Sequence, residues 1–119
     1  MVKLTPQEQD KLIKKEIKRW NDVFKDLSAD KKEVASRLVE RAAFMSVTLK
    51  ILEDDIKFKG PTYKFEQGVQ KMYVENPSQK SYNTMINRYT ATCSALFNLL
   101  PKEVAQEQDD GFDTFIGRR

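Results

Sequence analysis

The stretch from residue 30 to residue 58 constrains the fold most, because it lacks Gly and Pro and repeats apolar residues every three or four positions. Such spacing places side chains on one face of an α-helix. Asp30 is the predicted N-cap with Glu33 three residues later, and Gly60-Pro61 ends the pattern, so we predict a helix of roughly 40 Å. The predicted inward stripe comprises Val34, Leu38, Ala42 (or Arg41), Met45, Leu49, Leu52 and Ile56, widened by Phe44, Val47 and Ile51.

A shorter helix is predicted before it, over about residues 5–27. Thr5 is a suitable N-cap, Pro6 suits the first helical position, and Glu8 completes a capping box. Its apolar stripe has the spacing four, three, four, three along Ile13, Ile17, Trp20, Phe24 and Leu27.

A third helix is predicted over about residues 76–100, with Asn76 as N-cap, Pro77 at the first position and Pro101 after its end. Its predicted stripe comprises Tyr82, Met85 or Ile86, Tyr89, Cys93, Leu96 or Phe97, and Leu100.

Residues 62–75 have a different pattern. Residues 62–65 and 69–74 are rich in β-forming side chains, and Gly68 can supply the positive φ of a three-residue hairpin loop. We therefore predict a short β-hairpin between the last two helices. Because an isolated hairpin is marginally stable in water, it must pack on a helix or pair with a neighbouring chain.

Composition excludes several classes of function. The 119 residues are the length of one domain, and they contain no histidine, so His-based catalysis and most zinc and haem sites are excluded. A single cysteine, Cys93, points to a reducing compartment, and no apolar run approaches the roughly 18 residues of a membrane span. We therefore expect a soluble, cytoplasmic protein that is not an enzyme and uses no cofactor.

The low hydrophobic content, 39%, leads us to expect that a chain of this size buries part of its apolar surface against copies of itself. Charge is unevenly distributed: residues 1–32 carry a net +3 and residues 101–119 a net −2. We therefore predict a mainly α protein in three parts: a basic N-terminal helix (1–32), a helix–hairpin–helix oligomerisation core (33–100) and an acidic, flexible tail (101–119).

The order of elements over residues 34–100 carries a family resemblance. A long helix ends at Gly60, Tyr63 and Gly68 lie in a hairpin, Asn76-Pro77 opens the next helix, and Lys80 follows. This pattern resembles the short class of phage terminase small subunits, the DNA-packaging proteins of tailed phages and prophages. After Leu99 the chain departs from the family pattern, because the segment that follows is acidic.

The resemblance implies a non-enzymatic homo-oligomer, typically a ring, that binds the packaging site on double-stranded phage DNA in the host cytoplasm. It also implies that the chain delivers the DNA to a large terminase subunit, which carries the ATPase and nuclease. Consistent with that division of labour, the sequence contains no GxxxxGK[ST] phosphate-binding loop. The alternative function, from a different functional class, is that of an oligomeric helical scaffold or interaction protein that does not bind DNA.

The residues themselves indicate where DNA would bind. The lysines of the first helix lie three or four apart and share a face that can follow a phosphate backbone. The predicted contacts are Lys11, Lys14, Lys15, Lys18 and Arg19, with Lys64 and Lys71 of the hairpin as further candidates. Trp20 and the other aromatic residues could stack on bases, but their positions on the apolar stripes favour core packing.

Three other features have weaker functional interpretations. Glu53-Asp54-Asp55 suggests a metal site, but consecutive helical residues diverge, so we predict solvated charges. Cys93 is predicted to be a small buried hydrophobe. In the tail, Phe112, Phe115 and Ile116 alternate with acidic residues and are predicted to contact a partner, the large subunit, although a stray aromatic is common in such tails.

Overall fold

The first helix begins as its capping box predicts. In the computed structural model, which describes residues 4–101, α1 spans Pro6–Val23. The Thr5 hydroxyl accepts from the Glu8 amide (3.1 Å), and the Glu8 carboxylate accepts from the Thr5 amide (3.2 Å). These reciprocal bonds satisfy amide groups that a helix start leaves without partners. The chain then turns through the segment before Ser28.

The long central helix, α2, spans Ala29–Lys59. Its N-cap is Ser28, whose hydroxyl accepts from the Lys31 amide (3.4 Å), so the prediction of Asp30 as the cap is wrong. Asp30 lies in the first turn, where its negative charge interacts favourably with the positive end of the helix dipole. Gly60 ends α2 with φ 87°, a conformation that L side chains rarely adopt.

The predicted hairpin is present, with a tighter turn than expected. Strands β1 (Thr62–Gln67) and β2 (Gln70–Glu75) are antiparallel, and Gln67 pairs with Gln70. The loop is therefore two residues long, Gly68 and Val69, and the three-residue loop predicted from the sequence is wrong. Gly68 has φ 59° at the first loop position, where a type II′ turn requires glycine.

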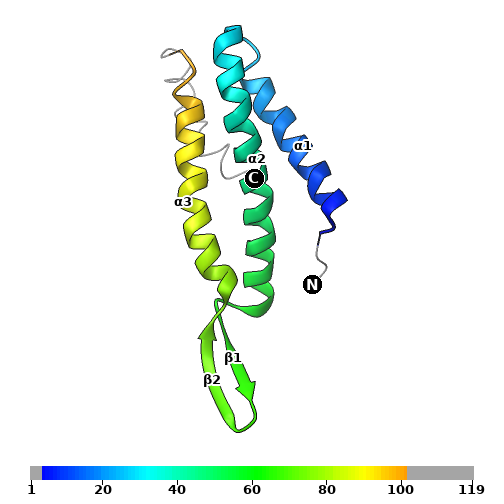
Figure 1. Ribbon diagram of the computed structural model, residues 1–119, viewed down its shortest axis with the longest axis vertical. Coiled ribbons are helices and arrows are strands. Elements are labelled where there is room, and N and C mark those ends of the chain that lie inside the picture. Colours follow the sequence, from blue (N-terminus) through cyan, green and yellow to red (C-terminus); the bar gives the residue numbers. More distant parts are fainter. Residues whose placement is uncertain (1–3, 102–119) are drawn as a thin grey trace.

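Helix α3 spans Pro77–Phe97 and returns along α2 (Figure 1). The Asn76 side chain accepts from the Ser78 amide (3.0 Å), which confirms the predicted N-cap. Both α1 and α3 pack against α2, so α2 is the middle of the bundle, and the hairpin extends beyond the end where α2 and α3 meet (Figure 1). The predicted class, mainly helical with a hairpin between the last two helices, is confirmed.

The core joins all three helices around Trp20, which is 0% exposed. Its ring stacks on Phe24 of the same segment (centroids 5.9 Å apart) and meets Phe97 edge to face (5.6 Å). Tyr89 and Cys93 are also fully buried. Trp20 is therefore a packing residue, as the apolar stripe indicated, and Cys93 is a buried thiol that is in no disulfide.

Small residues of α2 form much of its contact surface, and this corrects the predicted stripe. Ala42, Val47 and Leu49 are buried as expected, but Val34 and Phe44 are each 54% exposed. The helix is enclosed from two sides, and the small side chains that allow close packing were not part of the predicted stripe. These are Ala35, Ala43 and Ser46.

A polar network fixes the base of the hairpin. Asn76 is buried, and its Nδ2 donates to Asp55 Oδ2 (3.2 Å) and to the Gly60 carbonyl (3.0 Å). Ser78 Oγ donates to the same Asp55 oxygen (2.6 Å), and Lys59 Nζ lies 3.5 Å from Asp55 Oδ1. The network ties the end of α2 to the start of α3.

The prediction that Glu53-Asp54-Asp55 carries only solvated charges is therefore wrong for two of the three residues. Asp55 is buried in the network, and Glu53 accepts a hydrogen bond from the Tyr82 hydroxyl (3.2 Å). Only Asp54 is a surface charge, paired with Lys50 (3.2 Å). The sequence could not reveal this, because the partners lie more than twenty residues away on α3.

Candidate nucleic-acid interface

The lysines of α1 lie on the solvent side of the helix. Lys11, Lys14, Lys15 and Lys18 are all exposed, while Trp20 packs into the core from the opposite side. Within residues 4–101, none of the four ammonium groups is in an ion pair. The helix is thus anchored through its apolar face, and it presents four positive charges spaced along about two turns.

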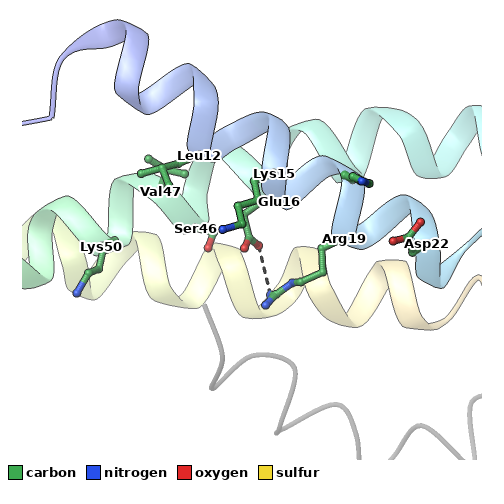
Figure 2. A pocket seen from close by; sticks show the side chains of 9 residues that line it. Leu12, Lys15, Glu16, Arg19, Asp22, Ser46, Val47 and Lys50 are labelled. Carbon is green, nitrogen blue, oxygen red and sulfur yellow. Dashed lines mark ion pairs between the residues drawn. The ribbon is translucent and has the colours of Figure 1, made fainter.

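Arg19 has a different environment from these lysines. Its guanidinium lies 3.3 Å from the Glu16 carboxylate, and its side chain is less exposed than those of the lysines. Figure 2 shows the ion pair at a groove between α1 and α2. Glu16 therefore partly neutralises the charge of Arg19. The sequence-based prediction treated Arg19 as equivalent to the four lysines, which lack such a partner.

The groove between α1 and α2 has a volume of about 570 Å³ and contains a basic residue that the sequence did not indicate. Lys50 of α2 lies at its edge, across from the α1 residues (Figure 2). Its ammonium group is paired with Asp54 at 3.2 Å. The sequence periodicity places Lys50 on the polar side of α2. It does not show that α1 lies beside Lys50, which only the folded structure reveals.

The hairpin lysines do not join this surface. Lys64 and Lys71 share one face of the hairpin, where Lys64 pairs with Glu66 (3.4 Å) and Glu66 stands directly opposite Lys71 in the register. Figure 1 places the hairpin beyond the end of the bundle, away from α1. Within one chain, the predicted DNA contacts therefore form two separate groups, and the charge of the second is reduced by its own glutamate.

The other face of the hairpin is apolar. Tyr63 stands opposite Val74, and Phe65 stands opposite Met72, so these four side chains lie on the same face. Phe65 and Met72 are exposed, whereas Tyr63 and Val74, nearer the base, are half-buried. Tyr63 lies beside Ile51 and Leu52 of α2, so within residues 4–101 the hairpin meets a helix only near its base.

Two ionisable side chains have perturbed pKa values. The Ser78 hydroxyl, which donates to Asp55, is the largest cause of a lowered pKa for that carboxyl; burial opposes it, and Asn76 and Lys59 add to the lowering. Burial raises the pKa of Tyr89, with Cys93 contributing. Both groups serve packing and positioning, since Asp55 holds the hairpin base and Tyr89 lies in the core.

The predicted partner contacts Phe112, Phe115 and Ile116 lie outside the described residues, as does the rest of the acidic segment. Within residues 4–101, no helix combines the length and apolar character needed to cross a membrane. No protein-family model, no curated protein and no solved structure matches the chain.

Proposed function

We propose that this chain is a DNA-binding adaptor of viral genome packaging, a terminase small subunit that binds double-stranded DNA through α1. The observation that carries the proposal is the row of exposed lysines on α1. Phosphate contacts from such a row position DNA without specifying its sequence. The proposed contacts are Lys11, Lys14, Lys15 and Lys18, with Arg19 and Lys50 at the border of the row.

The adaptor acts as a homo-oligomer, and the exposed apolar face of the hairpin supports this part of the proposal. Tyr63, Phe65, Met72 and Val74 form one face, and its outer pair, Phe65 and Met72, is exposed within residues 4–101. A second copy of the hairpin offers the same face and the same unpaired strand edges. A closed ring buries every such face without leaving an open end.

The adaptor itself is not an enzyme, and it works in the host cytoplasm. It recruits a large terminase subunit, and the proposed contacts for that partner are Phe112, Phe115 and Ile116. The order of helix, hairpin and helix over residues 34–100, which resembles the family, supports this assignment.

Binding of the full chain to a fluorescent DNA duplex at several salt concentrations tests the function. Replacing Lys11, Lys14, Lys15 and Lys18 with Ala should weaken binding to all duplexes similarly. It should also lower the salt slope by about one unit for each lost phosphate contact.

The matched control replaces four other exposed lysines, Lys31, Lys32, Lys57 and Lys80, with Ala. This variant has the same net charge, so its affinity reports the general effect of charge. Equal losses in the two variants would contradict a specific role of α1. A chain that forms an oligomer but shows no salt-dependent affinity for any duplex would favour the alternative, a helical scaffold.

A further inference from the structure

The outer face of α2 near its start carries an unexplained apolar and basic surface. Val34, Arg37, Arg41 and Phe44 recur at spacings of three, four and three, so they share one side of the helix. All four side chains are exposed, and Val34 and Phe44 are each 54% exposed. We call these four residues the α2 outer face.

A shallow groove of about 450 Å³ lies at the start of this face, lined by Val34, Arg37, Leu38 and Glu33. Within residues 4–101, neither Arg37 nor Arg41 is in an ion pair. Glu40 lies three residues after Arg37 and four before Phe44, so it borders the row, but within residues 4–101 it is in no ion pair with either arginine.

The chain contains a segment of complementary chemistry. Residues 107–116 hold four acidic residues and no basic one, together with three large apolar side chains. The acidic residues are Glu107, Asp109, Asp110 and Asp113, and the apolar ones are Phe112, Phe115 and Ile116. An acidic and aromatic segment fits a face on which two arginines lie between two apolar side chains.

The geometry of the bundle places this segment within reach. The start of α2 and the end of α3 lie at the same end of the bundle (Figure 1), and Leu100 and Ala35 belong to one core cluster. Phe112 follows Pro101 by eleven residues, a span of up to roughly 36 Å. Val34 and Phe44 are separated by roughly 15 Å along α2. The segment can therefore reach every residue of the α2 outer face in its own chain.

We propose that residues 107–116 dock on the α2 outer face of the same chain, with Phe112, Phe115 and Ile116 covering Val34 and Phe44, and with the aspartates facing Arg37 and Arg41. The docking is independent of DNA binding. If the same apolar residues also contact a large subunit, as proposed above, that partner competes with α2 for them.

A spin label on the segment tests the proposal directly. The full chain carries Thr114→Cys with a nitroxide attached, and the parent chain, whose Cys93 is buried, is treated identically as the labelling control. NMR should show broadened amide signals at residues 34–44 of the labelled chain. In a sample that mixes spin-labelled protein without isotope and unlabelled ¹⁵N protein, the same signals should stay sharp.

Charge reversal provides the specificity control. Arg37→Glu with Arg41→Glu should decrease the broadening severalfold, and adding Asp109→Arg, Asp110→Arg and Asp113→Arg should restore it. Reversal of two exposed cations on α3, Lys80→Glu with Arg88→Glu, should leave it unchanged. Absence of broadening at residues 34–44 would overturn the proposal. Broadening in the mixed sample would overturn it as well, because the occupant would then be the segment of a second copy.

Discussion

The helical bundle and the hairpin differ in how much of their side-chain surface they bury. The bundle encloses Trp20 and Tyr89 completely. The hairpin leaves Val69 98% exposed and Tyr73 77% exposed. Within residues 4–101 it is held at its base, where the Asn76 network joins α2 to α3. The bundle therefore depends on its interior for stability, whereas the hairpin depends on its base and on whatever covers its apolar face.

The largest expected effect is in the bundle. Trp20→Ala removes a fully buried ring that contacts Phe24 and Phe97, and it should lower the free energy of unfolding by about 3–5 kcal/mol. Tyr73→Ala on the hairpin is the comparison and should change it by less than about 0.5 kcal/mol. Urea denaturation followed by circular dichroism measures both. Similar losses in the two variants would show that the hairpin is part of the cooperative core.

The network at the base should give the next largest effect. Asn76→Ala removes the N-cap of α3 and the bonds to Asp55 and Gly60, and it should cost about 2 kcal/mol. Ser28→Ala removes only the cap of α2 and should cost about 1 kcal/mol. The difference between the two variants in the same denaturation experiment measures what the contacts between α2 and α3 add. Equal costs would reduce Asn76 to a simple helix cap.

The helix caps Asn76 and Thr5 illustrate how far the sequence predicts the fold. Asn76-Pro77 and the capping box at Thr5 are local signals, because the hydrogen bonds that they form span two or three residues. The helices and the hairpin were therefore predictable. The bond from Asn76 to Asp55 depends on how two helices pack, and no local pattern encodes it. The same holds for the small residues of α2, such as Ala35 and Ala43, which become contact residues only when a neighbouring helix approaches.

The candidate interface shows the same limit. Lysines at spacings of three and four predict one exposed face of α1, and the structure places all four there. Whether basic residues of other elements lie beside that face depends on the tertiary structure. Lys50 lies across a groove from α1, whereas Lys64 and Lys71 lie on the hairpin at the far end of the bundle.

The hairpin should affect assembly more than stability. Phe65→Ser with Met72→Ser removes a cross-strand pair from the apolar face, so we expect the oligomer to dissociate while helical content is retained. Tyr73→Ser, on the opposite face, is the matched control and should keep the native mass. Light scattering at micromolar concentration measures both. An unchanged mass for the double variant would assign assembly to another surface, and a monomeric parent chain would exclude self-association altogether.

The smallest expected effect comes from the ionisation of Asp55. Its pKa is lowered in the folded protein, chiefly by the Ser78 hydroxyl, so folding favours the ionised carboxylate. The resulting stabilisation is fully present above the ordinary pKa of an aspartate, about 3.9, and is lost as the pH falls through the folded value. We therefore expect Asp55→Asn to lower the melting temperature at pH 7, and we expect the difference in melting temperature from the parent chain to narrow below about pH 4.

Asp54→Asn is the control one residue away, where the carboxylate pairs with Lys50 at the surface, and such pairs contribute little. A gap that stays constant down to pH 2 would mean that Asp55 acts through the shape of its hydrogen bonds and not through its charge. The base of the hairpin would then be held in the same way at every pH, and acid would release the hairpin only when the bundle itself unfolds.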